Sequence, residues 1–292
     1  MKYGIFFAYW TKEWEVDYKK YIDKVSDLGF DILEILASSF AEKYSTDSQI
    51  MELREYAESK GIELTAGFGP PKEYNLGSGD PETVKNAIGF YADILPKLKK
   101  AGISFIGGGL NSYWPVDYSI PINKAEDWKN SVKNVKEVAK IAEDCGVVMG
   151  MEVLNRFEGY LINTCAETLE YVNEVNSPNV GIMLDTFHMN IEEDSMVDAI
   201  RLADKHLVHF HVGEQNRKVP GKGKLPWNEI GNALREINYQ KAVVMEPFVL
   251  SGSGKIVEDI KVWREIVTDS SESALDEDAR GALLFLKHTF GA

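Results

Sequence analysis

The sequence predicts a single (β/α)8 barrel, the TIM-barrel fold class, with one extra helix near its C-terminal end. Two observations carry this prediction: short apolar runs recur along the 292 residues, and each is followed by a longer stretch with helical periodicity. Repeated β-then-α units imply parallel strands joined by right-handed crossovers, and eight such units close a barrel. Since one barrel commonly uses about 250 residues or more, we expect residues 1–292 to form one domain.

Each expected strand is a short apolar run followed by polar or glycine residues. The runs cover residues 3–8, 31–36, 62–68, 104–109, 147–153, 180–185, 207–212 and 242–248. The stretches between them have the 3.6-residue periodicity of amphipathic helices, most clearly over residues 16–29, 48–61, 82–102 and 128–146. Each of these four stretches ends in glycine, the residue preferred just after a helix, so we expect eight helices to alternate with eight strands.

The chain continues beyond the eighth unit. Apolar residues near helical spacing over residues 275–290 predict a C-terminal helix packed on the outside or the floor of the barrel. A doubly wound sheet is the alternative architecture. The first expected strand lacks the G-x-G-x-x-G sequence that a dinucleotide-binding sheet of that kind needs, so the barrel is favoured.

Composition excludes several classes of function. The chain has 32 basic and 46 acidic residues, a net charge of −14, which repels phosphate backbones and anionic membranes. No apolar run reaches the roughly 18 residues of a membrane helix, and no signal-peptide cleavage pattern follows the first residues. Cys145 and Cys165 should lie toward opposite ends of the barrel as reduced thiols. We therefore expect a cytoplasmic protein with neither a nucleic-acid nor a membrane partner.

Ionisable residues close four consecutive strands. Glu152, Asp185, His211 and Glu246 each lie at or close to the end of an apolar run, and active sites of such barrels lie at the C-terminal ends of the strands. Because side chains alternate across a strand, each can share a face with residues of the barrel interior. Adjacent strands would then aim all four groups at one point.

Three carboxylates and one imidazole suit a hard divalent cation such as Mn²⁺, Mg²⁺ or Co²⁺. The four side chains would leave two positions of an octahedral ion open for two substrate oxygens. A single acid at a strand end is more often a helix cap or a solvated rim residue. The same chemistry at four successive strand ends favours a metal site.

Residues near these strand ends suit a polyhydroxylated ligand. Polar residues follow Glu152, Asp185 and His211, whereas His209 shares a strand face with His211 and is expected deeper, as a hydrogen-bonded core residue. Aromatic rings that can cover the apolar face of a sugar gather after strands one, three and four. They are Phe6, Tyr9, Trp10, Trp14, Phe68, Tyr113 and Trp114.

Five segments closely resemble the ketose 3-epimerase family, most of all its D-psicose (D-allulose) 3-epimerases, which are related to D-tagatose 3-epimerase. The segments are EVLNRFE (152–158), MLDTFHMNIEED (183–194), HFHVGEQNRKVPGKGKLPW (209–227), VVMEPF (243–248) and IGGGLNSYWPVDY (106–118). The resemblance covers nearly the whole chain. It implies a homodimeric or homotetrameric (β/α)8 barrel that binds a ketose and uses Mn²⁺ or Co²⁺, with Mg²⁺ as an alternative.

The resemblance also implies roles for individual residues. Glu152, Asp185, His211 and Glu246 match the metal ligands of the family, and Glu152 and Glu246 also match its two catalytic acid/base residues. The implied substrate-binding residues are Glu158, His188, Arg217, Phe6, Gly67, Gly109, Trp114 and Trp14. Phe6 stands where close relatives often have Tyr, and residues 250–258 depart from the family's usual glycine-rich stretch.

The expected reaction is epimerisation of ketohexoses at C3, such as the interconversion of D-fructose and D-psicose or of D-tagatose and D-sorbose. One carboxylate would remove the C3 proton, and the other would return a proton to the opposite face of a cis-enediolate. A divalent cation would stabilise the negative charge that develops. The alternatives are an aldose–ketose isomerase or inosose dehydratase with a similar metal cage, a metal-dependent phosphodiesterase, and a non-catalytic sugar-binding protein.

Overall fold

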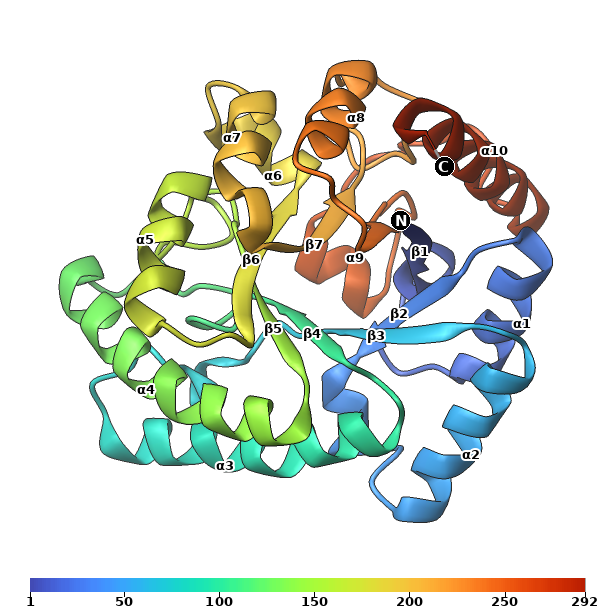
Figure 1. Ribbon diagram of the computed structural model, residues 1–292. Coiled ribbons are helices and arrows are strands. Elements are labelled where there is room, and N and C mark those ends of the chain that lie inside the picture. Colours follow the sequence, from blue (N-terminus) through green and yellow to red (C-terminus); the bar gives the residue numbers. More distant parts are fainter. Residues whose placement is uncertain (292) are drawn as a thin grey trace.

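The structure, a computed structural model that describes residues 1–291, contains a closed barrel of eight parallel strands in chain order (Figure 1). The strands are β1 (Lys2–Phe6), β2 (Ile32–Leu36), β3 (Glu63–Gly67), β4 (Phe105–Gly108), β5 (Val148–Glu152), β6 (Val180–Asp185), β7 (Leu207–Val212) and β8 (Ala242–Met245). Seven of them lie within the expected apolar runs, and β1 begins at Lys2, one residue before its run. The predicted barrel is therefore confirmed, and the assignment of residues 1–292 to one domain stays a prediction.

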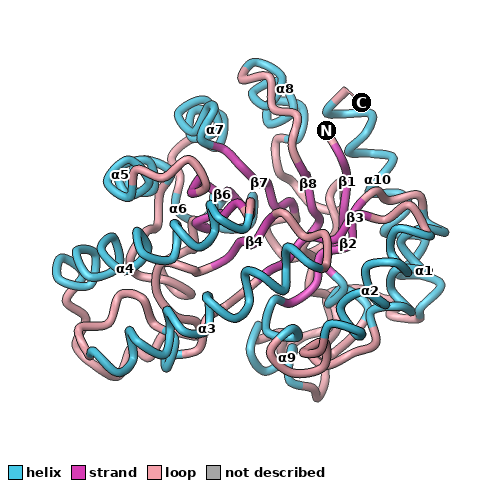
Figure 2. Tube along the Cα trace, turned by 60° about the horizontal axis from the view of Figure 1, so that its bottom comes forward, coloured by secondary structure: helices cyan, strands magenta, loops and turns pink. Residues whose placement is uncertain are grey.

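The helices surround the barrel (Figure 2). They are α1 (Tyr18–Leu28), α2 (Asp47–Ser59), α3 (Pro81–Lys100), α4 (Lys124–Cys145), α5 (Cys165–Val175), α6 (Thr186–Glu192), α7 (Met196–Ala203), α8 (Trp227–Glu236), α9 (Lys255–Ile260) and α10 (Glu272–Phe290). Every strand is followed by a helix, as expected, and the unit after β6 has two. Within residues 1–291, no helix combines the length and the apolar character needed to cross a membrane.

Local sequence signals explain where the helices begin and end. Asp17 and Asp80 accept hydrogen bonds from backbone N–H groups in the first turns of α1 and α3, and Thr46 forms a capping box with Gln49 at α2. Gly29 and Gly146 follow α1 and α4 in the left-handed conformation, where glycine avoids the steric cost of a side chain.

The C-terminal helix α10 packs against α1 and α8 on the outside of the barrel, as Figure 1 also shows. It begins three residues earlier than the sequence predicted, because Ser271 caps it by accepting a hydrogen bond from the backbone N–H of Ala274. Lys24 of α1 pairs with Asp276, and Arg235 of α8 donates to the carbonyl of Thr289. The predicted position on the barrel's outer face is thus observed.

Strand register brings the functional strand ends to one rim of the barrel. Glu152 pairs with Met183 in β6, Asp185 pairs with His211 in β7, and His211 pairs with Val244 in β8. The strand β8 ends at Met245, so Glu246 follows the strand directly. Since the strands are parallel, these four residues lie at the C-terminal end of the barrel, where barrel enzymes carry their active sites.

Candidate active site

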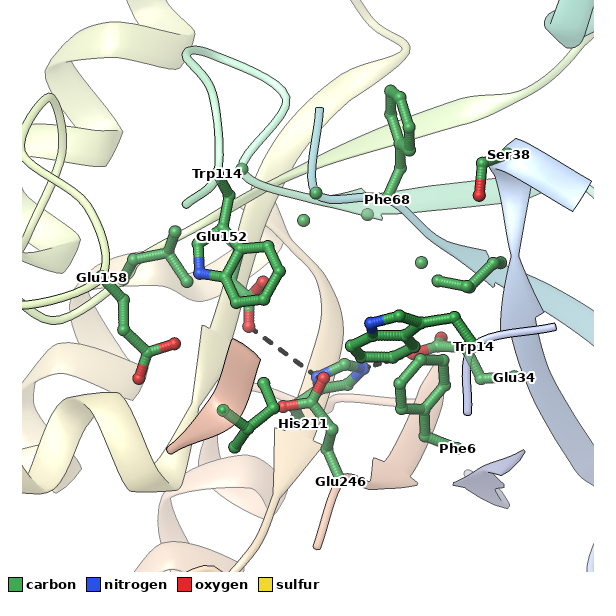
Figure 3. Close-up of a pocket in the computed structure, with 18 of the residues that line it drawn as sticks. Phe6, Trp14, Glu34, Ser38, Phe68, Trp114, Glu152, Glu158, His211 and Glu246 are labelled. Atoms are coloured by element: carbon green, nitrogen blue, oxygen red, sulfur yellow. Dashed lines mark hydrogen bonds and ion pairs between the residues drawn. The ribbon is translucent and has the colours of Figure 1, made fainter. Parts of the chain in front are cut away.

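A cavity of about 330 Å³ opens at this rim. Figure 3 shows acidic side chains and the His211 imidazole in its floor, with aromatic rings beside them. The volume falls within the range of small-molecule sites. Its lining includes every residue that the sequence proposed for substrate binding together with three of the four proposed metal ligands: Phe6, Trp14, Gly67, Gly109, Trp114, Glu152, Glu158, His188, His211, Arg217 and Glu246.

The fourth proposed ligand, Asp185, lies beneath the cavity beside His211. One potential ligand atom from each of Glu152, Asp185, His211 and Glu246 lies within 4.8 Å of the others. From Nδ1 of His211, the distances are 3.8 Å to Glu152 Oε1, 3.9 Å to Asp185 Oδ2 and 3.7 Å to Glu246 Oε1. Four residues from four chain segments therefore surround one point.

Unpaired buried atoms show that this point suits a cation. Glu152 Oε1, Asp185 Oδ2 and His211 Nδ1 are buried, and residues 1–291 offer them no hydrogen-bond partner. Leaving such polar atoms buried without a partner costs about 1–3 kcal/mol each, and more for charged groups. A divalent ion coordinated by these atoms would satisfy them together, and the donor set of oxygens and one nitrogen fits Mn²⁺, Co²⁺ or Mg²⁺.

Without a cation, burial and neighbouring carboxylates favour the protonated forms of two groups in this cluster. Burial raises the pKa of Glu152 well above its ordinary value, and the neighbouring Glu246 carboxylate raises it further. Burial by itself would lower the pKa of His211, but the Glu34 and Glu246 carboxylates raise it well above its ordinary value. A cation would replace these protons, because carboxylates and imidazoles bind metals in their deprotonated forms.

Arg217 links the cluster to the outer part of the cavity. Its guanidinium donates to Glu246 Oε2 at 3.0 Å and to Glu158 Oε1 at 3.3 Å, and it lies 3.7 Å above the centre of the Phe187 ring. The backbone of Arg217 has a positive φ of 63°, which turns its side chain back from the loop after β7. This geometry suits a rigid donor that faces oxygen atoms of a ligand.

His188 presents a single nitrogen to the cavity. Its Nδ1 accepts a hydrogen bond from the backbone N–H of Asn155 at 3.2 Å, so a neutral ring carries its proton on Nε2. Burial lowers the pKa of His188, which favours that neutral form. The Nε2 atom lies 3.9 Å from Glu152 Oε1 and is available as a donor toward the same point.

Aromatic and aliphatic side chains cover the other side of the cavity. Phe6, Trp14, Phe68 and Trp114 line it, as the sequence predicted. The indole N–H of Trp14 donates to Asp259 at 2.8 Å, which ties this wall to α9. Such surfaces pack against the C–H face of a ligand and exclude water from the polar floor.

Three aromatic residues expected at the rim do not line the cavity. Tyr9 donates its hydroxyl to the carbonyl of Leu275, and Trp10 packs edge-on against Tyr9. Tyr113 accepts a hydrogen bond from the backbone N–H of Asp117. The prediction was wrong for these three residues because the short 3-10 helix after β1 and the turn after β4 carry their rings outward, into contacts with the surrounding helices and loops.

Two glycines at the end of β4 are required by packing. A Cβ atom on Gly107 would lie 2.4 Å from the sulfur of Met183, and one on Gly108 would lie 2.2 Å from the carbonyl oxygen of Phe68. Gly108 also has φ +125°. At Gly67 and Gly109 an added Cβ would meet neighbouring atoms at 3.8 Å and 3.4 Å, so these glycines leave room at the cavity wall without being sterically obligatory.

The sequence analysis missed Glu34, a buried acid in the middle of β2. Its Oε1 lies 2.6 Å from Nε2 of His211, and its Oε2 accepts a hydrogen bond from Thr65 at 2.8 Å. His209 lies deeper in the barrel, as expected, and its Nε2 is 3.0 Å from Glu34 Oε2. The available signal was a single carboxylate inside an otherwise apolar strand, where an unpaired charge would be costly.

Glu214 is one of the polar residues after His211 that the sequence associated with a polyhydroxylated ligand, but the structure gives it a different role. Its buried carboxylate accepts hydrogen bonds from the backbone of Gly221 and Leu225 and from the indole of Trp227. These contacts hold the loop between β7 and α8. The side chain therefore stabilises the segment that carries Arg217 and does not face the cavity.

Comparison with known proteins agrees with this geometry. The family model described as xylose isomerase-like TIM barrel matches residues 22–266. The D-psicose 3-epimerase of Enterocloster bolteae is 61% identical over 291 residues, covering 100% of this chain and 96% of that protein. The crystal structure of D-psicose 3-epimerase with D-tagatose from Clostridium cellulolyticum H10 has a TM-score of 0.97 and 54% identity over 100% of both chains. A crystal structure of D-psicose 3-epimerase in the presence of D-fructose has a TM-score of 0.97 and 49% identity, again over 100% of both chains. The chain therefore belongs to the xylose isomerase-like TIM-barrel family and, within it, to the family of the D-psicose 3-epimerases.

Proposed function

We propose that the protein is a metal-dependent isomerase that inverts C3 of free ketohexoses and interconverts D-fructose and D-psicose. D-Tagatose and D-sorbose form a second substrate pair. The observation that carries this proposal is the pair of carboxylates, Glu152 and Glu246, whose Oε1 atoms lie 3.8 Å and 3.7 Å from the same nitrogen of His211. The relatives of 50% identity or more that carry the name D-psicose 3-epimerase support the same reaction.

Glu152, Asp185, His211 and Glu246 would hold the cation, which we propose to be Mn²⁺ or Co²⁺, with Mg²⁺ as an alternative. When bound, a divalent ion supplies positive charge beside the C2 and C3 oxygens and so lowers the energy of the enediolate form of the sugar. The unpaired Glu152 Oε1, Asp185 Oδ2 and His211 Nδ1 support this ligand set, as the donor chemistry of hard cations does.

The two glutamates perform the proton transfers. One carboxylate takes the C3 proton, and the electron pair of the C–H bond forms a C2=C3 double bond while the carbonyl oxygen becomes an enolate. The other glutamate, protonated on the oxygen that would not face the cation, then delivers a proton to the opposite face of C3 and restores the carbonyl group. Because the residues come from β5 and from the end of β8, they can approach the planar carbon from two sides.

The neighbouring polar residues orient the sugar. Arg217, which donates to Glu246 at 3.0 Å, and the Nε2–H of His188 offer donors to oxygen atoms at the O1 to O3 end of the ketose. Glu158 is held near them through Asn155 and accepts from a hydroxyl group. Fixed donors of this kind hold C3 at the distance and angle that proton transfer requires.

The far end of the ketose lies against the apolar wall. Phe6, Trp14 and Trp114 cover its C–H groups, while Gly67 and Gly109 leave room for its hydroxyl groups. Phe6 has no polar atom, so it makes no hydrogen bond to the sugar. We accordingly propose that this end of the pocket selects mainly by shape.

We further propose that the protein is a homodimer or homotetramer in the cytoplasm. The free thiols Cys145 and Cys165 fit a reducing compartment. Light scattering of the purified protein measures the oligomeric state directly, and fractionation of cells that express it measures the location.

The test of the reaction is proton NMR of D-fructose in D2O with metal-stripped protein, before and after Mn²⁺ is added. We expect D-psicose to form only with Mn²⁺ and to carry one deuterium at C3. At early times the remaining D-fructose should contain far less deuterium than the product, because a two-base path delivers its proton from the face opposite to the one it deprotonates.

Other products would identify the competing functions. Exchange at C1 with formation of an aldose would indicate an aldose–ketose isomerase, and loss of water would indicate a dehydratase. Metal-independent sugar binding without any exchange at C3 would contradict an epimerase and leave a binding protein.

A further inference from the structure

We propose that Glu34 is a positioning residue that fixes the tautomer of His211 and so presents the unprotonated Nδ1 of that ring to the cation. The inference rests on the metal-binding part of the proposed function. Glu34 lines the floor of the cavity, and its hydrogen bond to the proposed ligands is the one to His211. It acts on the centre through one imidazole.

The contact is direct and buried. Glu34 Oε1 lies 2.6 Å from His211 Nε2, and both side chains are at most 3% exposed. Figure 3 shows the imidazole between two carboxylates, with Glu152 on one side and Glu34 on the other. Since a carboxylate only accepts hydrogen bonds, the nitrogen that faces Glu34 must be the one that carries hydrogen.

The other nitrogen of the ring then faces the cation site with its lone pair. A neutral imidazole with hydrogen on Nε2 has a lone pair on Nδ1, and this is the atom that lies 3.7–3.9 Å from three carboxylates. The opposite tautomer would point N–H at the cation and would place a lone pair against the carboxylate of Glu34. Glu34 thus excludes the tautomer that cannot bind the metal.

Other residues hold Glu34 in the geometry that this role requires. Thr65, its neighbour on β3, donates a hydroxyl hydrogen bond to Oε2 at 2.8 Å. His209 lies 3.0 Å from the same oxygen, and its ring stacks on Phe105 with centroids 4.0 Å apart. The hydrogen bond from Thr65 holds Oε2, so Oε1 remains directed at His211.

A second metal ion is the competing interpretation of this cluster. Ligand atoms of Glu34, His209 and His211 lie close enough together to hold an ion. The 2.6 Å separation of Glu34 Oε1 and His211 Nε2 is the length of a strong hydrogen bond, and an ion would have to enter between them. The geometry therefore favours a hydrogen-bonded support of one ion over a second site.

The first experiment reads the tautomer in the unsubstituted protein. Long-range ¹H–¹⁵N NMR of the Mg²⁺-loaded protein, labelled at its five histidines, should show His211 with hydrogen on Nε2 and none on Nδ1. A proton on Nδ1 of His211 would overturn the proposal. Elemental analysis should give one ion per chain, and two ions per chain would overturn it as well.

The second experiment measures metal affinity by titrating metal-stripped protein with Mn²⁺. Glu34→Gln should weaken binding by about 10- to 100-fold, the usual effect of losing such a supporting group. Glu214→Gln is the matched control, because Glu214 is equally buried and also accepts several hydrogen bonds, but it lies outside the cluster. Thr65→Val, which removes one donor to Glu34, should show a smaller loss of affinity.

The outcomes separate this inference from the proposed function. Equal Mn²⁺ affinity for Glu34→Gln and the unsubstituted protein would refute the role of Glu34, whatever the turnover. An unfolded Glu34→Gln variant would leave the tautomer measurement and Thr65→Val to decide. Normal metal binding and the expected tautomer without C3 exchange would instead refute the epimerase function.

Discussion

Binding of the cation to the metal-free protein should depend steeply on pH. In the metal-free protein, burial and the nearby Glu246 carboxylate raise the pKa of Glu152 well above 4.5. Burial by itself would lower the pKa of His211, but the Glu34 and Glu246 carboxylates raise it well above 6.5. Both groups therefore keep their protons to a higher pH than usual, and a proton must leave each atom that binds a metal ion.

The number of groups sets an upper bound on this effect. Displacing one proton from each group would release two protons per ion, so the association constant should rise by at most about 100-fold per pH unit. That corresponds to about 2.7 kcal/mol per pH unit, since one unit of pKa equals about 1.36 kcal/mol. Glu34 remains the acceptor for Nε2–H throughout, so the proton lost from His211 is the one on Nδ1.

Isothermal titration calorimetry with Mn²⁺ measures this directly. Titrations between pH 6 and 8 in buffers of different ionisation enthalpy give both the affinity and the number of protons released. We expect between about one and two protons at pH 7. A pH-independent affinity with no proton release would show that both groups are already deprotonated, and it would refute this account of the site's electrostatics.

Stability of the metal-free protein should follow the same groups. The folded-state pKa values of His211 and Glu152 are raised, so the native state binds more protons than the unfolded state above the ordinary values of 6.5 and 4.5. Their contribution is complete below those values and is lost as the pH rises through the raised ones. The melting temperature should therefore fall with rising pH without metal, and the stabilisation by saturating Mn²⁺ should grow over the same range.

Three substitutions test other parts of the structure. Glu246→Gln should lower C3 epimerisation by about 10²–10⁴-fold, as expected for loss of a general acid/base, while equilibrium dialysis still detects binding of D-fructose; a near-full rate would remove Glu246 from the mechanism. Gly108→Ala should lower the free energy of unfolding in urea by more than about 2 kcal/mol, because its φ of +125° and the carbonyl oxygen 2.2 Å from the new Cβ both oppose a side chain. The control is Gly89→Ala, an exposed position in α3 where an added Cβ would have no described atom within 4 Å, and it should raise the free energy of unfolding by about 0.4–1 kcal/mol. Equal losses of stability at both sites would contradict the steric argument. Arg217→Lys should raise the KM for D-fructose by about tenfold or more, because lysine cannot stack on Phe187 and donate in two directions at once; an unchanged KM would exclude a role in binding.

The sequence alone determined the barrel and the rim on which the proposed ligands lie. Apolar runs alternating with amphipathic stretches specify parallel strands, and the two-residue period of a strand determines which side chains share a face. Glu152, Asp185 and His211 close such runs, so their approach follows from the local pattern and from the closure of eight strands. These signals are local, which is why they can be read along the chain.

Tertiary structure decided the contacts that join distant strands. Glu34 in β2 meets His211 across 177 residues of sequence, and nothing near either residue specifies that pairing. Loop conformation could not be predicted from the sequence either. Arg217, which has a positive φ, donates to Glu246, whereas the Glu214 carboxylate accepts hydrogen bonds from its own loop. Strand periodicity gives the face of a side chain, but its partner depends on barrel closure and backbone dihedral angles, which only the folded chain fixes.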